Sequence, residues 1–151
     1  MSDRVGQNQG ELARAQSTLQ ELERKHDRLR GLLVERRAER QDVERLNQEI
    51  AAAGDMDELV AVQSRVRLIE KAIAELLRAE ADCAQRIEST RRYLYALYVR
   101  LERLRQEYSG LMRRVASADQ VEGVPSDLLT NLGRIKIQLK AITGEESTGR
   151  L

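Results

Sequence analysis

The feature that most constrains the fold is a heptad repeat that runs without a stutter from residue 59 to residue 118. Apolar residues recur there at alternating spacings of three and four, with Glu80 and Thr90 as polar exceptions. A strict 3.5-residue repeat of this length predicts one helix of roughly 90 Å that supercoils left-handedly with a partner. Gly110 falls off the apolar seam and weakens the pattern only locally.

A second heptad precedes this central segment and extends from Leu12 to Ile50. Gly54 then predicts a helix end, since glycine is the common residue just beyond a helix C-terminus. Asp55 is followed three residues later by Glu58, which resembles a capping box and predicts the start of the next helix. The sequence therefore indicates two helices joined by a tight turn.

A third helix is predicted after a break that contains Gly123 and Pro125. Ser126 or Asp127 can cap its first turn. Its apolar residues repeat at spacings of 4-3-4-3, and they are Leu128, Leu132, Ile135, Leu139 and Ile142. The three expected helices span residues 10–53, 56–118 and 127–143.

Short turns favour antiparallel neighbours, and the two turns set registers that agree with the apolar seams. Folding at Gly54 makes facing residue numbers sum to 109, so that Val43 meets Val66. At the second turn the numbers sum to 243, and Leu139 meets Leu104. We predict an all-α fold: a long antiparallel coiled-coil hairpin with a third helix folded back along the end of the central helix. This single elongated domain covers residues 10–144, between flexible segments at 1–9 and 145–151.

The aromatic residues are concentrated in one segment, because three of the four Tyr lie in residues 91–100 and the chain has no Trp or Phe. This segment falls where the first and third helices should meet along the central helix. We expect the rings of Tyr93 and Tyr98 to fill a gap where those helices fail to abut, while Tyr95 points away. Tyr and Arg are enriched at binding hot spots. We predict a partner-binding patch of Arg91, Arg92, Tyr93, Tyr95, Tyr98, Val99 and Arg100; the competing interpretation is ordinary solvent exposure.

Polar residues at seam positions form a second group of candidates: His26, Arg36, Arg40, Asn47 and Glu80. Such residues commonly set the register or the pairing specificity of a coiled coil. His26 and Cys83 are expected in one layer, but one chain offers zinc only two of the usual four ligands. We therefore interpret these residues as a polar layer and expect no metal.

Catalysis is not indicated, because the chain has one His, one Cys and no Gly-rich phosphate loop or nucleophile elbow. The net charge of +1 argues against nucleic acid, although residues 86–114 hold eight Arg against three Glu. No uncharged run is long enough for a membrane helix, and the first ten residues lack the apolar core of a signal peptide. A single Cys fits a reducing compartment, so we expect a cytoplasmic location.

These observations predict a non-catalytic scaffold or adaptor subunit that needs no cofactor and binds partner proteins through its helical faces. Its expected partners are other helical proteins and further copies of itself, since a two-stranded rod buries only part of its apolar surface. One alternative is a chaperone-like or export-apparatus stalk that works through its tip. Another is a nucleic-acid-associated coiled coil, which the near-neutral charge disfavours.

Overall fold

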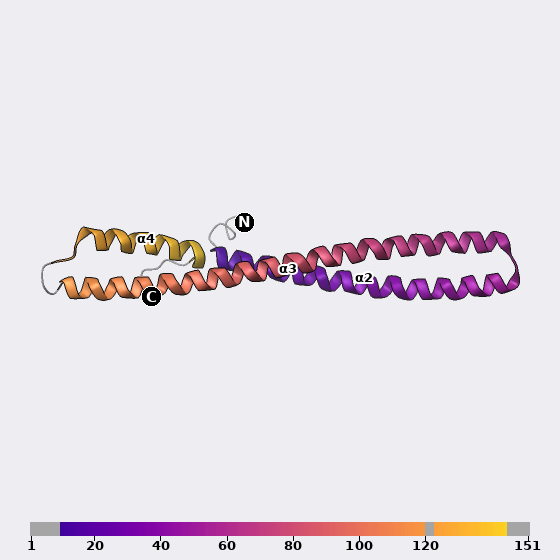
Figure 1. Ribbon diagram of the computed structural model, residues 1–151, viewed down its shortest axis with the longest axis horizontal. Helices are drawn as coiled ribbons and strands as arrows, with labels where there is room; N and C mark the ends of the chain where they lie inside the picture. The colour runs from indigo at the N-terminus through magenta and orange to yellow at the C-terminus, as the bar shows by residue number, and fades with distance from the viewer. Residues whose placement is uncertain (1–9, 120–122, 145–151) are drawn as a thin grey trace, which may run out of the picture. The chain divides into compact units, whose positions relative to one another are not determined.

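The computed structural model describes residues 10–119 and 123–144, and these residues form three helices and no strand. Helix α2 spans Glu11–Ala53, α3 spans Met56–Asp119 and α4 spans Ser126–Thr143. Helix α4 lies alongside the C-terminal part of α3 (Figure 1). The predicted all-α hairpin with a third helix is thus confirmed. The expected flexible segments, 1–9 and 145–151, lie outside the described residues.

The turn between α2 and α3 is built as the sequence indicates. Gly54 has a φ of 78°, in the left-handed region that favours glycine, and its N–H donates to the carbonyl oxygens of Ile50 at 3.1 Å and Ala51 at 3.3 Å. The Asp55 carboxylate accepts a hydrogen bond from the Glu58 N–H at 3.3 Å. One half of the expected capping box is therefore present.

The start of α4 differs from the expectation. Pro125 occupies the N-cap position in an extended conformation, and no side chain caps the helix. Instead the Leu128 N–H donates to the Pro125 carbonyl oxygen at 3.2 Å. The fixed φ of proline is compatible with this extended N-cap conformation, and the Pro125 carbonyl oxygen accepts the first hydrogen bond of the helix.

The chain divides into two compact units. Among the described residues, unit 1 comprises 10–20, 89–119 and 123–144, and unit 2 comprises 21–88. In unit 2, α2 packs along α3 through one cluster of buried residues: Leu33, Val43, Val62, Ile69 and Ile73. Ile50, Val66 and Leu76 are only partly buried against it. All of these are seam positions, as expected when two helices alone share one apolar stripe.

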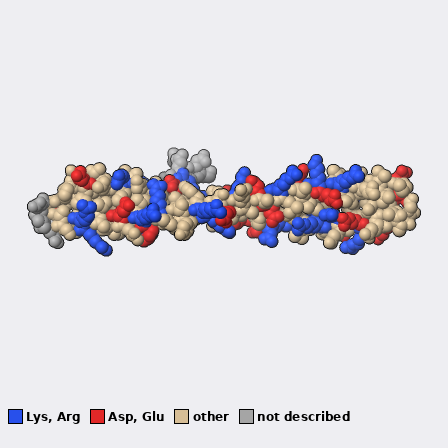
Figure 2. Space-filling model, in the orientation of Figure 1, with Lys and Arg blue, Asp and Glu red and all other residues tan. Residues whose placement is uncertain are grey.

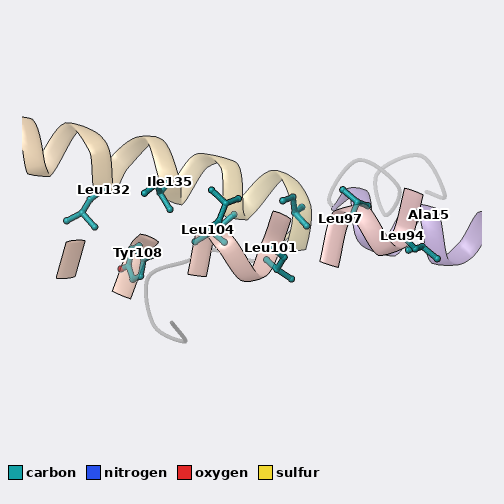
Figure 3. Packing of buried hydrophobic residues seen from close by; sticks show 10 residues of the cluster. Ala15, Leu94, Leu97, Leu101, Leu104, Tyr108, Leu132 and Ile135 are labelled. Carbon is teal, nitrogen blue, oxygen red and sulfur yellow. The ribbon is translucent and has the colours of Figure 1, made fainter. Parts of the chain in front are cut away.

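Unit 1 has a second apolar cluster in which α4 covers α3. Leu132 and Ile135 of α4 point toward α3, where Leu101, Leu104 and Tyr108 form the facing surface (Figure 3). Leu139 and Ile142 are the most deeply buried residues of α4, each 1% exposed. From α2, Ala15 joins the same cluster beside Leu94 and Leu97. Residues far apart in the sequence therefore share one core.

The end of α4 and the start of α2 meet through backbone atoms within unit 1. Gly10 is buried, and a Cβ built there would overlap the Ile142 carbonyl oxygen and would lie 2.6 Å from the Thr143 carbonyl carbon. Gly144 ends α4 in the left-handed conformation, with its N–H 2.7 Å from the Lys140 carbonyl oxygen. The prediction of a gap between the first and third helices is therefore wrong, because Gly10 has no side chain and lets the backbones of the two helix ends come into contact.

Candidate partner-binding surfaces

The seven residues of the predicted tyrosine patch surround α3 instead of sharing one face. Tyr93 and Tyr98 are five residues apart, which places them about 140° apart around a helix. Both rings are half exposed, at 49% and 48%, and Tyr95 is 72% exposed. Arg91, Arg92 and Arg100 are also exposed, whereas Val99 is half-buried. Any partner that contacted all seven would have to wrap around the helix.

Tyr98 is held by a specific contact. Its hydroxyl oxygen accepts a hydrogen bond of 2.9 Å from the Gln16 side-chain amide of α2. The ring thus lies over one flank of the α2–α3 seam in unit 1 and does not plug a gap between helix ends. Tyr98 is a structural neighbour of α2 as well as a surface residue.

Tyr93 lies on the other flank and lines a groove of about 570 Å³. The remaining walls come from α2 and from the preceding turn of α3, and they are Glu11, Arg14, Ala15, Thr18, Ser89 and Thr90. The groove is open and the surface that lines it is mostly apolar, with Tyr93 as its large aromatic side chain. It offers a surface for a side chain or a helix edge and lacks the enclosure typical of small-molecule sites.

Two more grooves follow the same side of α3, between that helix and the turn and helix after it. One has a volume of about 360 Å³ and is lined by Glu107, Gly110, Leu111, Arg114, Asn131, Arg134 and Ile135. The other has a volume of about 540 Å³ and is lined by Arg113, Arg114, Ser117, Ala118, Gly123, Pro125 and Leu128. Arg114 borders both. Because Gly110 has no neighbouring atom within 4 Å of an added Cβ, it leaves a notch in the wall.

The predicted polar layer of unit 2 is resolved into separate contacts. His26 Nε2 lies 3.6 Å from Glu80 Oε1, which joins α2 to α3. Arg40 also bridges the helices, with Nη2 3.5 Å from Glu70 Oε1 and Nε 3.1 Å from Glu44 Oε1. Three of the five layer residues, His26, Arg40 and Glu80, therefore take part in polar contacts between α2 and α3.

The other two α2 residues of that layer behave differently. Arg36 pairs with Glu39 of its own helix at 2.7 Å, so its guanidinium turns outward from the seam. Asn47 has a buried side-chain oxygen with no hydrogen-bond partner among the described residues. A buried unsatisfied oxygen costs stability, which makes Asn47 the most informative member of the layer.

Cys83 does not act with His26. Its buried thiol donates a hydrogen bond to the Leu22 carbonyl oxygen at 3.2 Å. Within residues 10–119 and 123–144, no group of three His, Cys, Asp or Glu side chains is placed to hold a metal ion. In the same part of the chain, no helix has the length and apolarity to cross a bilayer.

Three features of unit 1 are not predicted from the sequence: the close approach at Gly10, the notch at Gly110 and the position of Arg134 opposite Arg114. The first expected helix, 10–53, begins at Gly10, and nothing in the sequence indicates a contact at that residue. A signal for the grooves was present, because Gly110 and Arg114 lie four residues apart on one side of the central helix. The identity of the facing wall depended on how α4 packs. Comparison of the chain with protein-family models, curated proteins and solved structures found no match.

Proposed function

We propose that this protein is a non-catalytic scaffold or adaptor subunit that binds other helical proteins through the sides of its helices. The observation that supports this function is that each apolar cluster is formed between paired helices and buries only part of their apolar surface. Each is one helix pair deep, and seam residues such as Leu12, Leu19, Leu111 and Val115 stay only partly buried in unit 1. A further helix laid along either pair would remove more of this apolar surface from water.

The lone thiol also fits this proposal. Cys83 is buried and hydrogen-bonded, which suits a protein that works in a reducing compartment such as the cytoplasm. No catalytic constellation is needed for a scaffold, since its output is the positioning of partners.

The test is site-specific photo-crosslinking in the native source. A photoreactive residue replaces Leu68, which is 68% exposed on the side of α3 in unit 2. In a second variant it replaces Ile137, which is 73% exposed on the side of α4 in unit 1. We expect crosslinks to a small, reproducible set of proteins that map to helical segments. The control carries the same residue at Gln48, an exposed polar position. Crosslinks spread evenly over abundant proteins at all three positions would contradict the scaffold function.

A stalk that works through its tip is a second candidate, and the surface of the α2–α3 turn favours it. Ala51, Ala52 and Ala53 are exposed, as are Met56 at 67% and Val60 at 59%. On the face shown in Figure 2 most atoms at this end of unit 2 are uncharged, and the exposed residues Asp55, Asp57 and Glu58 add carboxylates to the same turn. An exposed apolar tip is what a hairpin inserted into a larger assembly would present.

Substitution at the tip separates the two candidates. Met56→Ser with Val60→Ser removes the apolar surface without touching the seam. Helicity should therefore be unchanged, and the free energy of unfolding should stay within about 0.5 kcal/mol of the original value. A stalk loses its cellular activity or its assembly in this variant, whereas a side-binding scaffold keeps its crosslinks at Leu68 and Ile137. Circular dichroism confirms that the variant remains folded.

A further inference from the structure

An acidic stripe runs along one side of α2 in unit 2. Its residues recur at spacings of 3-4-3-4-3, so they share one side of the helix. They are Leu32, Glu35, Glu39, Asp42, Leu46 and Glu49. The two leucines are 42% and 37% exposed, and no basic residue occupies this stripe. The stripe presents four carboxylates and two leucines. Glu39 pairs with Arg36 at 2.7 Å and Asp42 lies 3.9 Å from Arg45, which leaves Glu35 and Glu49 as the carboxylates without an ion pair among the described residues.

A basic groove of complementary character lies in unit 1. We define it by Gly110 and Arg114 of α3 and Arg134 of α4, which line one groove. The definition is extended to Arg100 and Arg103, which lie outside that groove but on the same side of α3. Glu107 is its one acidic member on α3. Across the described parts of the chain, no carboxylate lies within ion-pair distance of Arg114 or Arg134. Their charge is left for an external group.

The net charges of the two units are also of opposite sign: unit 1 is basic and unit 2 is acidic. The described part of unit 1 contains eleven Lys and Arg against five Asp and Glu, whereas unit 2 contains thirteen against sixteen. Figure 2 shows Lys and Arg side chains spaced along α3 and α4 of unit 1. Opposite net charge speeds and orients association, and like charge suppresses the contact of unit 1 with another unit 1.

We propose that the basic groove of one copy receives the acidic stripe of a second copy of this chain. The carboxylates of the stripe face Arg100, Arg103, Arg114 and Arg134, and a leucine enters the notch at Gly110 above Leu111. Apolar contact at the centre and charge pairs at the edge are the usual composition of a protein interface. This inference rests on the proposed scaffold function and names the chain itself as a partner.

Nucleic acid is a weaker occupant for the same groove. A polyanion would use the arginines of the groove but would give the leucine-containing acidic stripe no role. A second copy uses both surfaces and leaves neither unexplained. Since every copy carries one stripe and one groove, two copies offer two such contacts.

Sedimentation equilibrium of the purified full chain tests the association. We expect concentration-dependent dimers or larger species, weakened at least about tenfold when salt is raised from about 50 mM to about 500 mM, because exposed charge pairs are screened. A chain that stays monomeric at protein concentrations on the order of 100 μM would overturn the inference. If that monomer still forms the crosslinks described above, the proposed function stands and only the self-association fails.

Charge reversal locates the contact. Arg114→Glu with Arg134→Glu reverses the groove, and Glu35→Arg with Glu49→Arg reverses the stripe. Each double variant should associate at least about tenfold more weakly than the original chain. The matched control is Arg105→Glu, nine residues from Arg114 and so about 180° around α3. This control should associate as the original chain does, and circular dichroism should show all three folded.

Mixing the two double variants gives the decisive result. In the mixture, the original stripe of the groove variant meets the original groove of the stripe variant, so one native contact is restored. We expect heterodimers in the mixture under conditions where each variant alone is monomeric. Association that persists in both variants alone, or that fails to return on mixing, would show that these surfaces are not the interface. Retention of a nucleic acid oligonucleotide by the original chain, with no self-association, would also overturn the inference.

Discussion

At the scale of single residues, Gly10 has the strictest steric requirement in the described chain. A Cβ built on Gly10 would overlap backbone atoms of Ile142, Thr143 and Gly144, and backbone atoms cannot rotate away as a flexible side chain would. Position 10 comes directly before α2 and is held against the last residues of α4. The same glycine therefore fixes how two helix ends approach each other along α3.

Gly10→Ala should destabilise the protein by about 1–3 kcal/mol, because the added methyl group forces α4 or the start of α2 to shift. The matched change is Gly110→Ala, where the methyl group enters open space inside a helix and should stabilise by about 0.5–1 kcal/mol. Urea denaturation of both variants measures the difference. Equal effects of the two substitutions would contradict the close contact at Gly10.

Asn47 should lower the stability of the fold, because its side-chain oxygen is buried without a hydrogen bond. Its buried side-chain oxygen lacks a partner, so Asn47→Leu should stabilise the fold by about 1 kcal/mol. If Asn47 also sets the register, as its seam position predicts, the variant should populate additional oligomers or registers, since a buried polar residue limits alternatives. Melting temperature and light scattering check both effects. Gln48→Leu, on the exposed surface, serves as the control.

At the scale of elements, α4 is held by one side only. Leu139 and Ile142 are each 1% exposed, while Ile137 on the outer side is 73% exposed. Leu139→Ala should therefore cost about 2–5 kcal/mol through lost burial and a cavity, and Ile137→Ala should change stability by less than about 0.5 kcal/mol. Chemical denaturation gives both values. A similar cost at the two positions would mean that the outer side of α4 is covered in solution.

The elements also show why ion pairs contribute little here. Arg36–Glu39, Arg40–Glu44 and Arg86–Asp82 are pairs within single helices, and their side chains are largely exposed. Exposed pairs of this spacing stabilise a helix by roughly 0.3–0.5 kcal/mol each. The apolar seams, and not the charges, hold the helices together.

At the scale of the whole molecule, the two apolar clusters share no residue, so damage to one should stay largely in its own unit. Val43→Ala should raise amide exchange most in residues 30–50 and 60–76, and Leu104→Ala most in residues 97–108 and 128–142. Hydrogen exchange with mass spectrometry resolves these segments. An equal rise in both units for either variant would show that the chain opens as one cooperative body.

The amino-acid sequence by itself determined the helices and their pairing. The seams of Val43 with Val66 and of Leu139 with Leu104 follow from heptad spacing, and glycine and proline at the turns end the helices, because these are local or periodic properties of the chain. The tertiary structure alone decided how the ends of α2 and α4 meet at Gly10 and which residues face one another across the grooves beside Arg114. Contacts between helix ends and between side chains of different helices depend on distances of a few ångströms in three dimensions, and a one-dimensional repeat carries no information at that resolution.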